Sequence, residues 1–187
     1  MKHAALLAGA LCLCADIGAG AADSAPPTPD HFDSKFVQTR SLPGFSTPLV
    51  SHGVMRFDKQ HGFYWEITDP YHYVFQMNGA AAQETLPDGS VRHLDPQQTP
   101  WLAAVQHIIV NALSGDRSDL ERYFTVTVTP LPKGERVDLA PKQGPMGEAI
   151  TSIQVTESAP GHPEEIEIRE TSGDRMDIRF SGSAATP

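Results

Sequence analysis

The sequence has only two cysteines, Cys12 and Cys14, and both lie within residues 1–21. We predict that this segment is a secretory signal peptide: a positively charged start precedes an apolar run over residues 4–15, and small residues follow with an Ala-x-Ala-like cleavage site near residue 21 or 22. Cleavage there leaves a mature chain without cysteine. That excludes disulfides, thiolate ligands and cysteine nucleophiles, so an exported protein of this kind depends on its hydrophobic core.

The sequence also lacks a hydrophobic run long enough for a membrane anchor. Residues 4–15 fall short of the roughly 20 apolar residues that a spanning helix needs, and Asp16 interrupts the run. A lipoprotein signal is the alternative, because the segment contains cysteine. However, Leu11 and Leu13 precede the two cysteines, where lipoprotein processing requires a small residue. A cleavable signal peptide therefore remains the prediction.

Basic residues are scarce. The chain has 14 Lys and Arg against 23 Asp and Glu, which gives a formal net charge of −9. An acidic protein of this kind has no electrostatic attraction for nucleic acid or for anionic membrane surfaces.

Catalytic and cofactor motifs are also missing. The sequence contains no G-x-S-x-G elbow, H-E-x-x-H helix, phosphate-binding loop or dinucleotide glycine fingerprint. Its histidines are not spaced as metal ligands; His72, between two tyrosines, is the most site-like, and a histidine on the wet face of a strand is the simpler interpretation. Glu165 and Glu167 alternate with isoleucines, which indicates a solvated strand face. We therefore expect no cofactor, no metal and no enzymatic activity.

Short segments that alternate apolar and polar residues fill most of the chain. Clear examples are residues 63–68, 71–77, 124–129, 165–169 and 176–180, and turn signals at Asn78-Gly79 and Asp88-Gly89 separate two others. Residues 32–40 suit a strand or a short helix, and residues 150–155 alternate imperfectly, which suggests a β-bulge. This pattern predicts nine to eleven antiparallel strands in one domain over residues 32–182, after a disordered leader at 22–31 and before a loose tail at 183–187.

Residues 99–115 are the only long segment with helical periodicity. Trp101, Leu102, Val105 and Ile109 share one apolar face, Thr99 suits the N-cap, and a glycine follows the last turn. A single helix cannot bury such a face on itself, so a sheet must receive it. The predicted fold is mainly β (α+β): a curved antiparallel sheet that forms an incomplete barrel, covered by this helix as a lid or plug.

The order of several motifs supports a family resemblance. A Phe-x-Gln strand opening (Phe36, Gln38) is followed by a glycine in the next strand (Gly53) and by an aromatic strand with Trp65 that closes on Pro70. Later matches are Asp88-Gly89, the LSGD sequence at residues 113–116, Leu120, Phe124 and the closing GDRMDIRF segment at residues 173–180. Over roughly residues 32–182, the chain resembles the periplasmic outer-membrane lipoprotein carrier (LolA-like) family.

The resemblance implies an incomplete β-barrel with a concave apolar face closed by helices. It also implies a periplasmic carrier that moves the acyl chains of lipoproteins from an inner-membrane releasing transporter to an outer-membrane receptor, without a cofactor and as a monomer. The basic turn that latches the lid in familiar members has no match here, because residues 58–61 read Asp-Lys-Gln-His. No latch residue is therefore assigned.

An acyl-chain site requires apolar area more than any particular residue, since each buried methylene contributes about 0.8 kcal/mol. The candidate lining residues are Trp65, Ile67, Phe75 and Met77 from the strands and Trp101, Leu102, Val105 and Ile109 from the helix. The alternative is that these residues pack a dry core and that the protein is a non-transporting lipid-sensing or protein-interaction module of the envelope on the same fold. The cargo, whether lipoprotein, free lipid or acylated metabolite, stays open.

Overall fold

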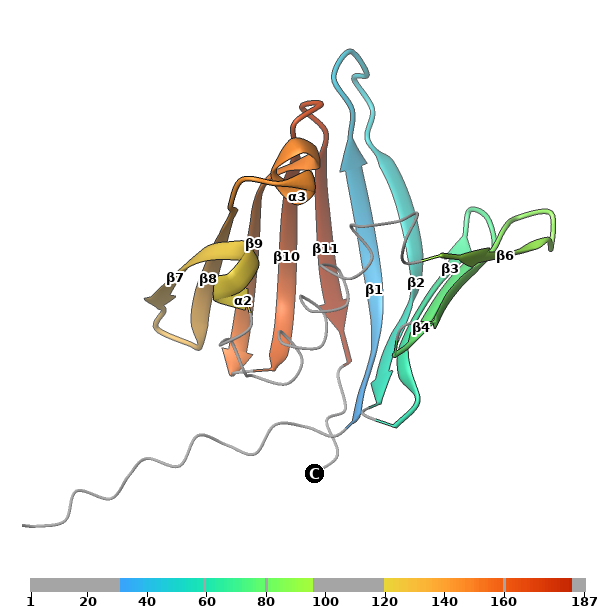
Figure 1. Ribbon diagram of the computed structural model, residues 1–187, viewed down its shortest axis with the longest axis horizontal. Coiled ribbons are helices and arrows are strands. Elements are labelled where there is room, and N and C mark those ends of the chain that lie inside the picture. Colours follow the sequence, from blue (N-terminus) through green and yellow to red (C-terminus); the bar gives the residue numbers. More distant parts are fainter. Residues whose placement is uncertain (1–30, 59, 80, 96–119, 160, 183–187) are drawn as a thin grey trace, which may run out of the picture.

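The computed structural model describes residues 31–58, 60–79, 81–95, 120–159 and 161–182 (Figure 1). The predicted signal peptide, tail and 99–115 helix lie outside these residues, and so does the predicted leader apart from residue 31. The described elements are eleven strands and two short helices: β1 (His31–Ser41), β2 (Leu49–Asp58), β3 (Gly62–Asp69), β4 (Tyr73–Asn78), β5 (Ala81–Thr85), β6 (Val91–Leu94), α2 (Leu120–Tyr123), β7 (Phe124–Pro130), β8 (Glu135–Pro141), α3 (Pro145–Ala149), β9 (Ile150–Ala159), β10 (His162–Glu170) and β11 (Arg175–Ser181).

All eleven strands form one sheet in the order β6-β5-β4-β3-β2-β1-β11-β10-β9-β8-β7, and every neighbouring pair is antiparallel. The first and last strands pair at the middle of the sheet, and a meander runs from each of them to an open edge. Figure 1 shows the sheet curving from β7 round to β6 without closing. This confirms the predicted fold class, a curved antiparallel sheet that forms an incomplete barrel.

In each strand the apolar residues recur at every second position, and the pairing register gathers them on one face of the sheet. For example, Phe36 pairs with Phe180 on one side and with Gly53 on the other. We call the face that carries these side chains the inner face, and the opposite one the outer face. The inner face is defined by Phe32, Phe36, Met55, Phe57, Phe63, Trp65, Ile67, Tyr73, Phe75, Met77, Ala82, Val126, Val137, Leu139, Ile153, Val155, Ile166, Ile168, Met176, Ile178 and Phe180.

The buried side chains of the inner face form two clusters. The aromatic cluster comprises Phe32, Phe36, Met55, Phe57, Phe63, Ile67, Phe75, Met77, Ala82 and Ile178, with Trp65, Tyr73 and Phe180 packed against it. The aliphatic cluster comprises Leu120, Phe124, Val137, Leu139, Met146, Ile153 and Val155. The two short helices belong to the second cluster, because α2 supplies Leu120 and α3 supplies Met146.

Two of the irregularities in the pairing bear on the sequence pattern and on the candidate site. The β9–β10 register shifts between Arg169 and Glu170, so that Ser152 and Ile150 find partners and Thr151 is skipped. This is the bulge that the imperfect alternation predicted. A second shift, between His52 and Gly53 in the β2–β3 pair, was not predicted. It lies beside the candidate site.

Candidate functional site

Gly53 allows two aromatic rings to meet on the inner face. A Cβ atom at this position would lie 1.9 Å from the Glu66 carbonyl oxygen and 2.4 Å from Cζ of Phe36. Because glycine leaves this space free, the Phe36 ring stacks on Trp65, with ring centroids 3.8 Å apart and planes 22° apart. The glycine that the sequence offered only as a family feature thus has a packing reason.

The four strand residues predicted to line the site lie together on this face. Trp65 pairs with Phe75 across β3 and β4, and all four belong to the aromatic cluster or pack against it. Ile67, Phe75 and Met77 are buried, whereas Trp65 is only partly buried. The strand half of the predicted site is therefore contiguous.

The helix half of the prediction cannot be placed. Trp101, Leu102, Val105 and Ile109 lie outside the described residues. They stay a prediction.

Sequence reasoning missed several neighbours of the site. The Phe63 ring lies 6.4 Å from Trp65 and 6.2 Å from Phe75, and Phe32 meets Phe180 edge to face at 6.1 Å. Aromatic pairs of this geometry each stabilise by roughly 0.5–1.5 kcal/mol beyond the area that they bury. The period-two pattern of β1 and β2 carried a signal for Phe32. The contact with Phe180 depends on a pairing between the two ends of the domain, which no local pattern reports.

One polar group interrupts the inner face near the β6 edge. The Glu84 carboxylate is only 9% exposed; it accepts a hydrogen bond of 2.9 Å from the Tyr73 hydroxyl and one of 3.0 Å from Nε of Arg92. Burial raises the pKa of Tyr73 well above its usual value, and the hydrogen bond to Glu84 raises it further. The cluster pairs a buried Glu84 with an exposed Arg92, and it bounds the apolar surface of β3 and β4.

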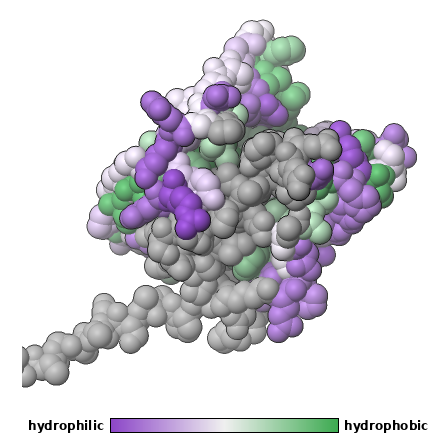
Figure 2. Space-filling model, viewed as in Figure 1, coloured by the Kyte–Doolittle hydropathy of each residue, from purple (hydrophilic) through white to green (hydrophobic). Residues whose placement is uncertain are grey.

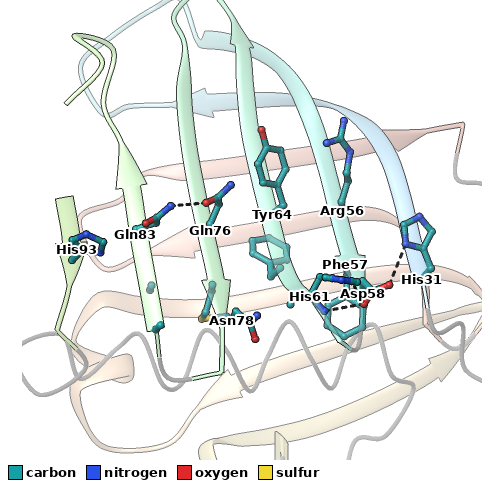
Figure 3. A pocket seen from close by; sticks show the side chains of 15 residues that line it. His31, Arg56, Phe57, Asp58, His61, Tyr64, Gln76, Asn78, Gln83 and His93 are labelled. Atoms are coloured by element: carbon teal, nitrogen blue, oxygen red, sulfur yellow. Dashed lines mark hydrogen bonds and ion pairs between the residues drawn. The ribbon is translucent and has the colours of Figure 1, made fainter. Parts of the chain in front are cut away.

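A groove of about 640 Å³ lies where β2 to β6 meet the β2–β3 and β4–β5 turns (Figure 3). Four of its polar residues, Arg56, Tyr64, Gln76 and Gln83, form one cross-strand row at outer-face positions. The Gln83 amide donates to Gln76 at 2.6 Å, and the Arg56 guanidinium lies 5.2 Å from the Tyr64 ring centre. The rest of the lining includes Phe57, Phe63, Met77 and Ala82, so the groove combines polar and apolar surface.

A carboxylate at the end of the same groove is held by its own turn. Backbone amides of His61 and Gln60 donate to Asp58, which holds the pKa of Asp58 below its usual value. The rings of His61 and His31 also face this carboxylate, at 2.9 Å and 3.9 Å. Within the part of the chain that the structure describes, no group of three metal-ligating side chains occurs.

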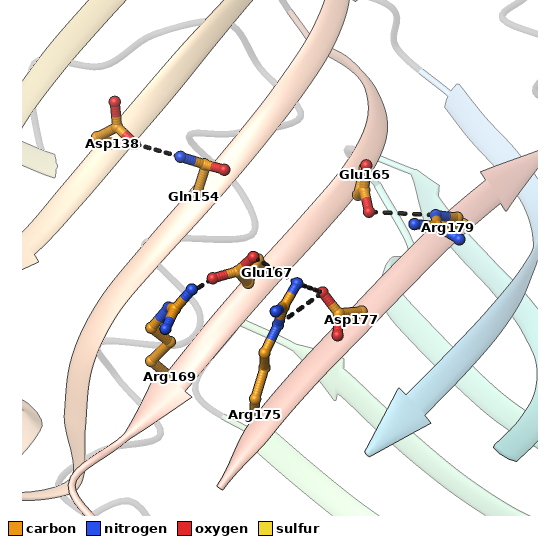
Figure 4. Close-up of polar contacts among 8 residues, drawn as sticks. All are labelled: Asp138, Gln154, Glu165, Glu167, Arg169, Arg175, Asp177 and Arg179. Carbon is orange, nitrogen blue, oxygen red and sulfur yellow. Dashed lines mark hydrogen bonds and ion pairs between the residues drawn. The ribbon is translucent and has the colours of Figure 1, made fainter. Parts of the chain in front are cut away.

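The two polar motifs noted in the sequence lie at the surface. His72 is exposed, and its Nε2 lies 3.1 Å from Glu66, which also accepts a hydrogen bond from Tyr64. Figure 4 shows Glu165 and Glu167 paired with arginines of β10 and β11 on the outer face. Such exposed pairs contribute little stability each, and both motifs are best described as solvated surface.

Among the residues that the structure describes, no helix has the length and hydrophobicity of a membrane-spanning segment.

Comparison with known proteins gives one family match. The family model described as "Outer membrane lipoprotein carrier protein LolA" matches residues 28–187. No curated protein matches the sequence.

Similar solved structures have low sequence identity. They include a LolA superfamily protein, NE2245, from Nitrosomonas europaea, with 10% identity, coverage of 87% of this chain and 89% of that chain, and a TM-score of 0.45. A putative outer membrane lipoprotein-sorting protein domain from Vibrio parahaemolyticus has 10% identity, coverage of 81% and 84%, and a TM-score of 0.38. MucB in the MucA/MucB complex of Pseudomonas aeruginosa has 15% identity and a TM-score of 0.36; the match covers 84% of this chain and 53% of that one.

Proposed function

Given that the chain belongs to the outer membrane lipoprotein carrier protein LolA family, we propose that it is a periplasmic carrier for the acyl chains of lipoproteins or lipids. In this proposal residues 1–21 are removed on export, and an acyl chain binds on the inner face and travels from the inner to the outer membrane. The partners are an inner-membrane transporter that releases the cargo and an outer-membrane receptor that accepts it.

The observation that carries the proposal is the aromatic cluster on the inner face. Trp65, Phe75 and Met77 lie side by side on neighbouring strands and present apolar surface without a polar side chain between them. An acyl chain with a dozen methylenes gains about 10 kcal/mol when it is fully enclosed, and part of that on one face, before the costs of association are subtracted. That gain is sufficient to hold a lipid tail in water.

The composition of the cluster supports a surface that adapts to a ligand. Met55 and Met77 are buried in it, and Met176 packs against it. Methionine is unbranched and polarizable, so it fills spaces of variable shape. The partly buried Trp65 is the point at which an entering chain first meets the cluster.

The helix residues complete the proposed site. Trp101, Leu102, Val105 and Ile109 would cover the acyl chain from the side opposite the sheet. Their apolar face needs a partner, and the inner face is the apolar surface of matching character. Opening of this cover would release the cargo.

The proposal is tested by native mass spectrometry of protein purified from the periplasm, followed by lipid extraction. We expect bound acylated species in the wild type and none in Trp65→Glu, because a carboxylate on the inner face would have to enter an apolar surface. Tyr64→Glu is the matched control: it places the same charge one residue away, on the outer face. It should keep the lipid.

Wild-type protein without lipid, and unable to bind an acyl probe, would contradict the carrier function. Equal loss of lipid in the two variants would contradict the assignment of the inner face. A dry core together with one fixed protein partner in crosslinking would favour the interaction module instead.

A further inference from the structure

The turn between β1 and β2 carries the most exposed large hydrophobic residue that the structure describes. We call residues 41–50 the hairpin tip. Phe45 is 72% exposed, Leu49 58% and Val50 45%. Single exposed apolar residues are common, but three within six positions form a patch, and such patches are typical of interaction sites.

The hairpin tip is uncharged. Residues 41–51 contain no Lys, Arg, His, Asp or Glu, in a chain in which charged residues make up 20%. The charged groups at its base are paired: Arg40 lies 3.1 Å from Glu170 and 2.7 Å from Asp174, which leaves one net negative charge there. A side chain at the tip can therefore leave water without taking a charge with it.

The hairpin tip also projects and is internally ordered. Figure 1 shows the β1–β2 hairpin extending beyond the neighbouring strands, and Figure 2 shows hydrophobic residues along one side of this projecting end. The amide of Phe45 donates to the Leu42 carbonyl at 3.1 Å, with Pro43 and a left-handed Gly44 between them. Pro43 packs beside Gly173 of the β10–β11 turn. The backbone of the turn is thus ordered before contact, which lowers the entropic cost of inserting Phe45.

The position of the hairpin tip relates it to the proposed site. In β2, Leu49 is in register with the inner-face positions Ser51, Gly53 and Met55 and continues the line of the inner face, whereas Val50 lies at an outer-face position. A surface that receives the tip would also lie next to one end of the acyl-binding face.

We infer that the hairpin tip inserts Phe45, Leu49 and Val50 into the interfacial region of a lipid bilayer. A bilayer fits better than a protein partner, because a specific protein interface needs roughly 800 Å² on each side, which ten residues on a convex turn do not supply. Reversible bilayer contact needs only a few inserted apolar side chains. Since the protein carries a net charge of −9, zwitterionic lipid is favoured over anionic lipid. A role of this contact in cargo transfer rests on the proposed function; the contact itself does not.

The test is flotation of purified protein with phosphatidylcholine–phosphatidylethanolamine vesicles, for the wild type and for Phe45→Ser/Leu49→Ser. We expect the double variant to lose at least about tenfold in vesicle affinity, because interfacial binding scales with the apolar area inserted. Val91→Ser is the matched control, since Val91 is 55% exposed at an outer-face position of β6 and should bind as the wild type does. Both changes lie at exposed positions, and unchanged melting temperatures would verify folding.

An acyl-probe measurement on the same samples separates this inference from the proposed function. Tip-dependent flotation supports the inference, whether or not the probe binds. Absence of wild-type flotation overturns it, as does equal flotation of the wild type and the double variant, even where the probe binds. Stronger binding to vesicles that contain phosphatidylglycerol contradicts the preference for zwitterionic lipid. Tip-dependent binding to envelope vesicles but not to pure lipid overturns it in favour of a protein receptor.

Discussion

The aromatic and aliphatic clusters lie on the same face of one sheet but differ in their side chains. The aromatic cluster is rich in Phe and Met and includes a partly buried Trp65. The aliphatic cluster is built mainly from Val, Leu and Ile, and α2 and α3 pack on it. Branched aliphatic side chains have few rotamers and pack closely, whereas large flat or unbranched ones adapt to a guest. We assign stability to the aliphatic cluster and acyl binding to the aromatic one.

The largest expected effect is that of Gly53→Ala in the aromatic cluster. The new Cβ would meet the Glu66 carbonyl oxygen, so we expect unfolding to become easier by about 4 kcal/mol. Urea denaturation measures this. Gly79→Ala is the control: its Cβ meets nothing within 4 Å, and only the positive φ costs about 1 kcal/mol. Equal losses in the two variants would remove the packing role given to Gly53.

Leu139→Ala in the aliphatic cluster should be the next largest. Leu139 is 2% exposed, and its truncation leaves a cavity that costs about 2–5 kcal/mol of unfolding free energy. If the two clusters divide their roles as described, the affinity for an acyl probe stays unchanged at a temperature where the variant is folded. A variant with near-normal stability but weak probe binding would reverse the assignment.

Phe75→Leu should show the opposite pattern. The smaller side chain removes part of the apolar surface beside Trp65, and we expect the probe affinity to fall roughly fivefold, which corresponds to about 1 kcal/mol. Stability should fall by about 1 kcal/mol, less than in Leu139→Ala, since leucine is still hydrophobic and the change removes less volume. Fluorescence titration and thermal unfolding, performed side by side with Val137→Ala, separate the two quantities. Probe affinity that responds to Val137→Ala as strongly as to Phe75→Leu would mean that both clusters bind.

The smallest effect concerns the pH dependence at the polar border of the aromatic cluster. The pKa of Tyr73 is raised from 10.0, chiefly by burial. Above pH 10 the unfolded chain therefore loses this proton before the folded chain does, and stability falls as the pH rises. In Tyr73→Phe the fall should be shallower. Denaturation curves between pH 9 and 11 measure the slope; an identical slope in the variant would show that other groups account for it.

The sequence predicted the elements whose signal is local. Phe63, Trp65 and Ile67 alternate as one-sided strands do, and the glycines of Asn78-Gly79 and Asp88-Gly89 adopt the positive φ that their turns require. The family resemblance then supplied the open barrel. Trp65, Phe75 and Met77 could be placed on one face because antiparallel neighbours keep the alternation in register.

The remaining features depend on contacts that no window of sequence contains. Phe180 packs against the aromatic cluster because β1 pairs with β11, about 140 positions later. The ion pair of Glu84 and Arg92 on the inner face follows from a hairpin register, and it occupies strands that the pattern predicted only weakly. Helix α3 has five residues, too few for a periodic signal.

The central claim is that an acyl chain binds against Trp65 on the inner face. The sequence has two tryptophans, and Trp101→Phe leaves Trp65 as the single tryptophan, which can be excited selectively. Fatty acids brominated along the chain quench a tryptophan only on close contact. The control replaces both native tryptophans by Phe and introduces Val91→Trp on the outer face. The account predicts strong quenching of Trp65 and none of the tryptophan at position 91; saturable binding of the brominated lipid without quenching of Trp65 would contradict it.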